Sequence, residues 1–222
     1  MHSLAPEYLS RLAFDASQLG TISRLGEARG RQDLFVAQIP EQLEVLRRAA
    51  VVESSKSSNR IEGVVAPRAR VEALVSDDVK PQDRSEQEIA GYRDALHLMH
   101  DSHEHMAFTT NVVLQLHSML FRYLPSEGGV WKATDNEIVE RDAQGRVTRV
   151  RFVPTPAVAT PGAMQTLTGT YDIARRDGRA DPLILVPLAI LDFLCIHPFR
   201  DGNGRMARLL TQIGRASCRE RV

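Results

Sequence analysis

The 222-residue sequence is poor in cysteine and aromatic residues and has no excess of charge of either sign. Its two cysteines, Cys195 and Cys218, provide neither a disulfide framework nor the spacing of a metal site. The 28 basic and 28 acidic residues balance, so net charge gives no reason to expect nonspecific binding to nucleic acid or membranes. The longest apolar stretch, 183–196, is interrupted by Pro187 and Asp192 and is shorter than the roughly twenty residues that span a bilayer. Because no basic-then-apolar signal pattern opens the chain either, we expect a cytoplasmic protein.

The sequence instead concentrates reactive side chains in one run of twelve residues, His197-Pro198-Phe199-Arg200-Asp201-Gly202-Asn203-Gly204-Arg205-Met206-Ala207-Arg208. Pro198 disfavours the helical conformation at His197, so the apolar segment before it should end with the imidazole at its C-terminus. With an unperturbed pKa of about 6.5, this imidazole can accept a proton near neutral pH. The run therefore begins with a candidate general base.

The rest of the run is suited to phosphate. Gly202 and Gly204 can adopt positive φ, which lets successive backbone N–H groups converge on an anion. A helix starting just after Gly204 would add its dipole, and Arg205 and Arg208 would share one face of it as a clamp for two phosphate groups. Asp201 offers a hard oxygen for Mg²⁺ shared with those phosphates. The run thus predicts chemistry on a phosphate.

Two other interpretations of the run are weaker. Gly202-x-Gly204-x-x-Ala207 fits the loose dinucleotide-binding fingerprint, but no strand pattern precedes it and the chain ends before an acidic partner roughly twenty residues on. A plain loop between helices, carrying a surface histidine, would not need so many specified residue types.

The run resembles the signature of the Fic family, His-Pro-Phe-x-Asp/Glu-Gly-Asn-Gly-Arg-x-x-Arg, with every specified position matched. The resemblance implies an all-α fold with one β-hairpin, in which a buried central helix ends at the signature loop. It also implies transfer of AMP from ATP to a Ser, Thr or Tyr hydroxyl of a target protein, with Mg²⁺ and release of pyrophosphate. The roles it implies are His197 as general base, Asp201 as the Mg²⁺ ligand, Gly202, Asn203 and Gly204 as the anion pocket, Arg205 on phosphate oxygens, and Arg208 on the γ-phosphate.

A second motif lies at the end of the helix expected over about 41–59. By itself, Ser58-x-x-x-Glu62-Gly63 is typical of a solvated helix end stopped by glycine. Beside the signature, it resembles the inhibitory motif of the Fic family, Ser/Thr-x-x-x-Glu-Gly/Asn. The resemblance implies that Glu62 faces Arg208, blocks the position of the γ-phosphate and makes the enzyme autoinhibited.

Other patterns predict the elements around these motifs. Alternation over 137–140 and 147–153, with a turn at 142–145, predicts a hairpin. In the family a hairpin called the flap aligns the target segment, partly by β-strand addition, and Ile138 and Val139 are the candidate contacts. A capping box from Ser85 to Glu88 predicts a helix over about 86–100.

Helix starts and stops are expected at several further positions. Thr110 or Asn111 should cap a helix, and Thr160-Pro161 and Asp181-Pro182 should each start one. The last of these is apolar nearly all round and should be the buried central helix. The histidine cluster at the end of the capping-box helix is interpreted as a solvated helix end rather than as a metal site. It comprises His97, His100, His103 and His105, with Glu104.

We divide the chain into three parts on these patterns. Residues 1–80 form an arm with the inhibitory helix, in which the pieces over 1–40 are broken by Gly20, Gly26, Gly30 and Pro40, and 81–212 form a truncated Fic core. The last part, 213–222, resembles the translation of a common sequencing adapter rather than a family sequence, so we interpret the sequence as a truncated gene model with a non-native tail. Relatives continue with more core helices and often a winged helix-turn-helix module, through which alone we expect nucleic-acid binding.

Several functional alternatives stay open at this point. Relatives with the same signature transfer UMP, phosphate or phosphocholine, or remove AMP. A regulatory protein, or an inactive fragment that lacks a C-terminal DNA-binding module, is the non-enzymatic alternative. A homodimer is possible, and the target protein cannot be deduced from the sequence.

Overall fold

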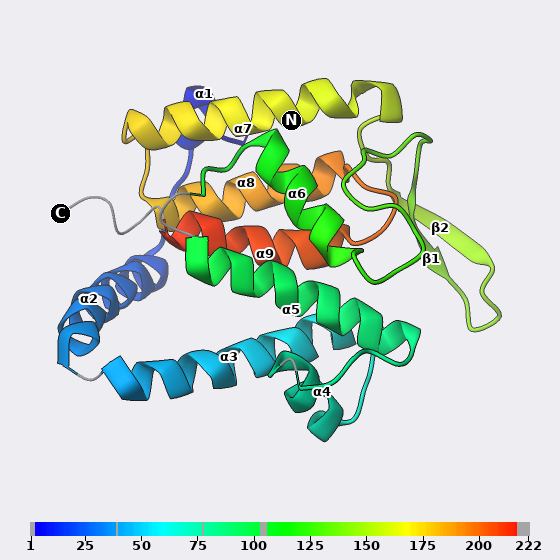
Figure 1. Cartoon of the computed structure of the whole chain (residues 1–222). Coiled ribbons are helices and arrows are strands. Elements are labelled where there is room, and N and C mark those ends of the chain that lie inside the picture. Colours follow the sequence, from blue (N-terminus) through cyan, green and yellow to red (C-terminus); the bar gives the residue numbers. More distant parts are fainter. Residues whose placement is uncertain (1–2, 39, 77, 103–105, 217–222) are drawn as a thin grey trace.

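The chain is helical apart from one β-hairpin, as the sequence predicts (Figure 1). The structure is a computed structural model that describes residues 3–38, 40–76, 78–102 and 106–216. In chain order its elements are α1 (Pro6–Leu9), α2 (Ala16–Gln38), α3 (Pro40–Ile61), α4 (Arg68–Val75), α5 (Arg84–Ser102), α6 (Thr110–Leu120), β1 (Ile138–Arg141), β2 (Val147–Phe152), the short 3₁₀ helix η2 (Ala157–Ala159), α7 (Thr160–Arg176), α8 (Pro182–Ile196) and α9 (Asn203–Ala216). Among the described residues, no helix combines the length and apolarity needed to cross a membrane.

The long helices form successive layers around α8. From top to bottom in Figure 1, α7, α8, α9, α5 and α3 follow one another, and each packs on the next. One side of α8 is buried through Leu185, Ala189 and Phe193, while Leu183 and Leu191 on another side are 42% and 47% exposed. The helix is therefore central, as expected, but its burial is not complete.

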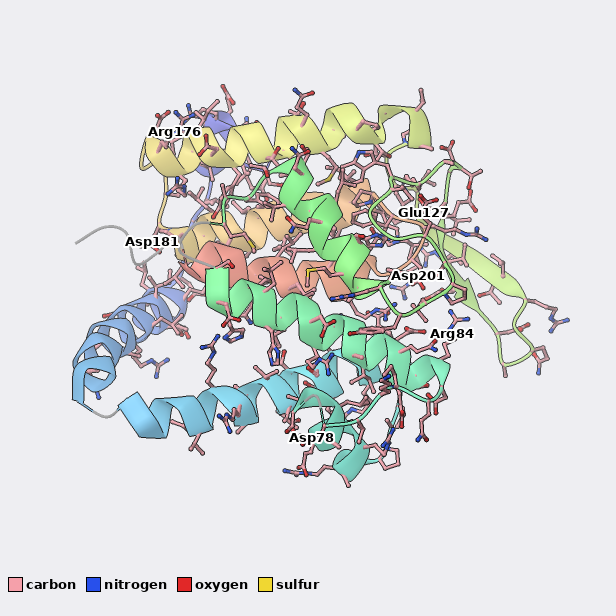
Figure 2. All side chains as sticks on the ribbon, in the orientation of Figure 1. Asp78, Arg84, Glu127, Arg176, Asp181 and Asp201 are labelled. Atoms are coloured by element: carbon pink, nitrogen blue, oxygen red, sulfur yellow. The ribbon has the colours of Figure 1, made fainter. Side chains whose placement is uncertain are left out.

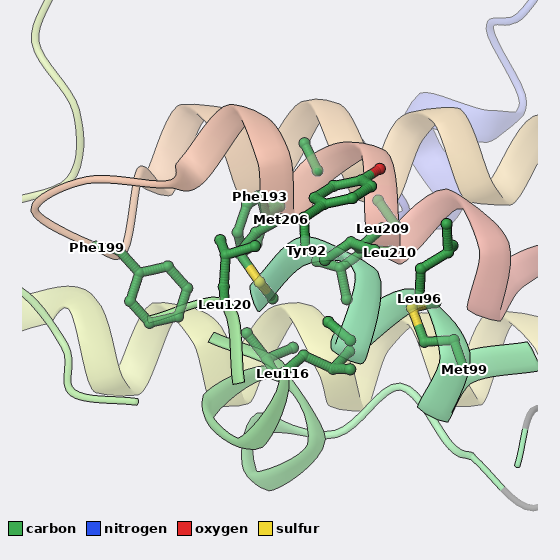
Figure 3. Close-up of a cluster of buried hydrophobic side chains, with 14 of the residues drawn as sticks. Tyr92, Leu96, Met99, Leu116, Leu120, Phe193, Phe199, Met206, Leu209 and Leu210 are labelled. Atoms are coloured by element: carbon green, nitrogen blue, oxygen red, sulfur yellow. The ribbon is translucent and has the colours of Figure 1, made fainter. Parts of the chain in front are cut away.

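The core lies where α5, α6, α8 and α9 meet (Figure 3). Tyr92 of α5, Leu120 of α6, Phe193 of α8 and Met206 of α9 are at most 2% exposed. Phe199, from the loop between α8 and α9, is fully buried in the same core. The loop that carries the signature residues is therefore anchored in the centre of the molecule by its own aromatic side chain.

The predicted capping box at Ser85 is wrong, because the helix begins slightly earlier. The N–H of Glu86 donates to Oδ1 of Asp83 at 2.9 Å, and Oε2 of Glu86 accepts from the N–H of Gln82 at 2.8 Å. Asp83 is therefore the capping side chain. This leaves Glu88, which the capping box would have used, free to pair elsewhere.

Other predicted helix boundaries also shift. The cap of α6 is Thr109, which accepts from the N–H of Val112 at 3.3 Å, rather than Thr110 or Asn111. Thr160 is not a cap, because its hydroxyl donates to the carbonyl of Pro156 at 3.1 Å. The cap at Asp181 is confirmed by its 2.8 Å contact with the N–H of Leu183.

The N-terminal arm differs most from the prediction. The expected breaks at Gly20, Gly26 and Gly30 are wrong, because α2 continues through all three glycines. The expected break at Pro40 is confirmed, since α2 ends at Gln38 and α3 begins at Pro40. A glycine inside a helix costs only about 1 kcal/mol, so it need not end one. The histidine cluster lies at the end of α5, and its members His103 and His105 fall outside the described residues. Within the described part, no group of three or more potential ligands forms a metal site.

The predicted hairpin is confirmed as an antiparallel pair of strands. Ile138 pairs with Phe152 and Val139 with Val150, and two irregularities interrupt the register. The second strand, β2, is exposed over most of its length. The hairpin projects from the end of the molecule at which the loop between α8 and α9 lies (Figure 1).

Candidate active site

The signature loop starts at His197, which ends α8 in the left-handed conformation. Its φ is 51°, and its N–H donates to the carbonyl of Phe193 at 2.9 Å. The imidazole is half-buried, and burial is the main cause that lowers its pKa below the ordinary range. The charge of Lys132 lowers the pKa further, and the backbone of Leu194 opposes both effects. The structure therefore favours a neutral His197.

A side-chain clip holds the loop closed between Phe199 and Asn203. The N–H of Phe199 donates to Oδ1 of Asn203 at 2.9 Å, and Nδ2 of Asn203 donates to the carbonyl of Phe199 at 2.7 Å. Asn203 is 3% exposed, so both contacts are shielded from water. The amide expected in the anion pocket is thus occupied in shaping the loop that carries it.

His117 of α6, which the sequence did not mark as functional, supports the loop from below. Its ring stacks on Phe199 with centroids 3.6 Å apart and planes 3° apart. The N–H of Gly129 donates to its Nδ1 at 2.8 Å, so Nε2 carries the proton and donates to the carbonyl of Asp201 at 3.1 Å. Burial lowers the pKa of His117 to about 4. His117 is therefore a neutral support for the loop.

Asp201 and Gly202 form the exposed tip of the loop. The Asp201 side chain is 61% exposed, and its Oδ1 accepts from the N–H of Gly202 at 2.6 Å. Figure 2 places Asp201 at the end of the molecule near the hairpin. Gly202 has φ of 79° and lies against the Phe121 ring, so a larger residue would be both strained and crowded. The accessible carboxylate of Asp201 fits the hard-oxygen ligand that Mg²⁺ requires.

Arg205 lies deeper than the clamp predicted from the sequence. Its side chain is 2% exposed, and Nη1 donates to Oε2 of Glu88 on α5 at 2.6 Å. Its guanidinium also lies 5.8 Å from the centre of the Phe121 ring and 3.7 Å from Oδ2 of Asp201. In this arrangement Arg205 ties α9 to α5 and places its positive charge behind the loop.

Arg208 is held by the end of α3. Its Nε donates to the Ser58 hydroxyl at 2.7 Å, and its Nη2 donates to the Ser58 carbonyl at 3.0 Å and to Oε1 of Glu62 at 2.6 Å. Gly63, with φ of 79°, ends the helix directly after Glu62. The structure therefore brings the signature and the suspected inhibitory motif together, although 146 positions separate Glu62 from Arg208.

Glu62 also lies over the start of α9. A side chain at Gly204 would collide with Oε1 of Glu62, so the glycine leaves the room that the carboxylate occupies. Gly204 is the second residue of α9, and the N-terminal end of a helix favours negative charge. A carboxylate of the protein itself thus occupies the position predicted for an anion.

Lys132 is the second residue near the site that the sequence analysis missed. It lies in the loop before the hairpin, is 5% exposed, and donates from Nζ to the carbonyl of Ile196 at 3.2 Å. Nothing in the local pattern of Trp131-Lys132-Ala133 separates this lysine from a surface lysine. Its burial results from contacts with a segment that lies 64 positions away.

The two candidate flap residues remain accessible. Ile138 is 37% exposed and Val139 is half-buried, both on β1. The opposite strand is held to β1 by an ion pair, with Nε of Arg151 donating to Oε1 of Glu140 at 2.6 Å. The hairpin therefore leaves both candidate side chains at least partly accessible.

Comparisons with known proteins agree with this architecture. Solved structures similar to the chain include a Fic domain containing signaling protein from Bacteroides thetaiotaomicron (23% identity, TM-score 0.69, 80% of this chain and 66% of that chain covered). Others are a Fic family protein from Desulfovibrio desulfuricans (23%, 0.70, 91% and 58%) and Fic-1 from C. elegans (21%, 0.61, 91% and 60%). The chain thus spans less than two thirds of the length of these proteins.

At these identities the structural likeness establishes the fold alone. No curated protein sequence matches the chain. A family model does, however: the model of the Fic/DOC family matches residues 107–213, a segment that contains α6, the hairpin, α8 and the whole signature loop. In this segment, the chain is similar to the Fic/DOC family.

Proposed function

We propose that the protein transfers AMP from ATP to a hydroxyl group of a target protein. The observation that carries the proposal is the pairing of a neutral, half-buried His197 with an anion position at the start of α9, a few residues further along the same loop. A base and a phosphate site at this spacing suit nucleophilic attack by a hydroxyl on a bound nucleotide.

The reaction follows from the proposed roles of the residues. His197 takes the proton of the target hydroxyl, whose oxygen attacks the α-phosphorus of ATP. The bond between the α-phosphorus and the bridging oxygen breaks, and pyrophosphate leaves. Asp201 would hold Mg²⁺, which neutralises charge on the phosphates. The N–H groups at the start of α9 would bind phosphate oxygens, with Arg205 adding positive charge and Ile138 and Val139 aligning the target strand.

We propose further that Glu62 keeps the enzyme autoinhibited. Arg208 is the expected partner of the γ-phosphate, and Glu62 engages it while covering Gly204. A charge-assisted hydrogen bond contributes about 1.5 to 3 kcal/mol net, or roughly 10- to 150-fold in an equilibrium. Inhibition of this size is substantial but incomplete, so the wild-type protein should retain weak AMP-transfer activity.

The Glu62→Gly variant tests both parts of this proposal. We expect it to transfer label from α-³²P-ATP into proteins of a cell lysate at least about tenfold faster than the wild type, because Arg208 is released. His197→Ala in the same background should abolish transfer while ATP binding persists. Glu127→Gly, which makes the same change at an exposed loop residue, is the matched control and should leave the rate unchanged.

Two results would count against these proposals. Equal rates for Glu62→Gly and wild type would refute autoinhibition. Mass spectrometry of the modified target identifies the group transferred, and a mass increase of anything other than AMP would replace adenylyl transfer by another chemistry of this family.

A further inference from the structure

Lys132 is a buried lysine that contacts the backbone at the start of the signature loop. Its Nζ donates to the carbonyl of Ile196 at 3.2 Å and to Oδ1 of Asn136 at 2.8 Å. Its backbone N–H donates to the carbonyl of Pro198 at 2.9 Å. The two carbonyls belong to the residues directly before and after His197, so one lysine binds the backbone on both sides of the candidate base.

The neighbours of Lys132 extend this clamp. Nδ2 of Asn136 lies 3.5 Å from the carbonyl of Phe199, and the Trp131 ring stacks on Phe199 with centroids 5.2 Å apart. Segment 131–136 thus holds the loop at three backbone carbonyls and one aromatic ring. The same segment leads directly into β1 at Ile138, so it also connects the hairpin to the loop.

A buried ammonium is costly unless the contacts around it compensate for lost hydration. Lys132 is 5% exposed, and the partners given above are a carbonyl and an amide rather than a carboxylate. Asp135 is the acidic group whose charge acts on it, and desolvation lowers the pKa of Lys132. For filling space alone, an apolar residue of similar length would avoid this cost, which indicates a role for the charge itself.

We propose that Lys132 is a positioning residue for His197, holding the backbone on either side of the imidazole and placing a positive charge beside it. This inference rests on the proposed function, in which His197 must be neutral to accept a proton. A positive charge disfavours imidazolium, so Lys132 keeps the base ready when ATP, whose phosphates favour imidazolium, is bound.

The groups that face the imidazole are consistent with this role. Apart from burial, the effects on the pKa of His197 come from the Lys132 charge, which lowers it, and from the Leu194 backbone, which raises it. The Asp201 carboxylate and the Arg205 guanidinium act on His117. Removing the Lys132 charge should therefore raise the pKa of His197.

The direct test is an NMR titration of the His197 ring in the whole protein. The His197→Gln variant identifies the signal by its loss. Lys132→Gln removes the charge but keeps an N–H donor, and Lys132→Met removes both. We expect the pKa of His197 to rise by at least about half a unit in both variants. Lys132→Arg, which keeps the charge and the donors, should restore a value close to wild type.

Lys80→Met is the matched control, because Lys80 is exposed in the loop before α5. It removes one positive charge from the protein and should leave the pKa of His197 unchanged. An unchanged pKa in Lys132→Gln would overturn the proposal, as would an equal rise in Lys80→Met. If Lys132→Met does not fold, the titration of Lys132→Gln against Lys132→Arg decides the question alone.

A second readout connects the inference to turnover. In the Glu62→Gly background, the acid limb of the pH–rate profile should move upward by the same amount in Lys132→Gln, so activity falls more at pH 6 than at pH 8. The titration needs no turnover. A raised pKa without AMP transfer would therefore contradict the proposed function and leave the role of Lys132 intact, whereas transfer with an unchanged pKa would contradict Lys132 alone.

Discussion

At the level of single residues, His117 and His197 differ in whether their ring nitrogens are hydrogen-bonded. Both ring nitrogens of His117 are engaged, by the N–H of Gly129 and the carbonyl of Asp201. The His197 ring is less enclosed, and its buried Nδ1 has no hydrogen-bond partner among the described residues. A histidine with both nitrogens committed cannot serve as a base, so its environment makes His117 a support, whereas the open Nδ1 of His197 agrees with the base role proposed for it.

The support role makes stability depend on pH. The pKa of His117 falls from an ordinary value near 6.5 to about 4 on folding. The contribution of neutral His117 to the free energy of unfolding is therefore fully present above about pH 6.5. It is lost as pH falls toward 4, because the unfolded chain binds the proton more tightly than the folded one. Between pH 7.5 and 5.5 this amounts to about 1 to 1.5 kcal/mol.

Urea denaturation at the two pH values measures this effect. We expect His117→Gln to lower stability at pH 7.5 through lost stacking, but to weaken the decline between pH 7.5 and 5.5 by about 1 to 1.5 kcal/mol. His197→Gln is the matched control and identifies the share of the decline that is due to His197. The same decline in His117→Gln as in wild type would contradict the neutral state of His117.

At the level of elements, the turn from α8 to α9 depends on the Asn203 clip. Both bonds of Asn203 to Phe199 are buried, so removing the amide takes the partner from the Phe199 N–H and leaves the Phe199 carbonyl with the longer 3.5 Å contact from Asn136. We expect Asn203→Ala to lower the free energy of unfolding by about 2 to 3 kcal/mol. Asn111→Ala, at an exposed position in the first turn of α6, should change it by less than about 0.5 kcal/mol. A similar small change in Asn203→Ala would show that the loop does not need the clip.

Sequence patterns identify the elements better than their ends. The hairpin and the long apolar helices follow from periodicity, which reflects the face that each element buries. A helix cap depends on a single side-chain contact, which any of several adjacent residues can make. Asp83 rather than Ser85 therefore caps α5, and Thr109 rather than Thr110 caps α6. The glycines of α2 show the same limit, since helix continuity depends on more than one residue's preference.

At the level of the whole molecule, the site is assembled from segments far apart in the sequence. The signature loop could be found because its reactive residues are adjacent. Lys132, His117 and Glu88 could not, because each acquires its role through contacts with residues 64 to 117 positions away. A lysine, a helical histidine and a glutamate in a helix are ordinary in their local patterns. Their functional placement depends on how α5, α6 and the segment before β1 pack on α8 and α9.

The N-terminal segment shows how far such contacts extend. The hydroxyl of Ser3 donates to Oδ1 of Asp192 at 2.6 Å, and the N–H of Ser3 donates to Oδ2 at 3.0 Å, across 189 positions. Both residues are at most 5% exposed. Beside them, Leu4 lines a cavity of 420 Å³ between α7 and α8 that also reaches Cys195. Ser3 and Leu4 therefore pack against α8, the helix whose C-cap is His197.

The contact between Ser3 and Asp192 gives a stability prediction for the whole fold. Ser3→Ala removes one of the two bonds to a buried carboxylate, and hydrogen bonds to charged groups contribute about 1.5 to 3 kcal/mol. We expect a loss of that size in the free energy of unfolding, measured by urea denaturation. Ser10→Ala, whose hydroxyl makes an exposed 3.2 Å contact with the Glu7 carbonyl, should cost less than about 0.5 kcal/mol. Equal free energies of unfolding for the two variants would contradict this prediction. Water would then replace the lost bond to Asp192 without cost, and the Ser3 contact would stabilise the fold no more than a surface turn does.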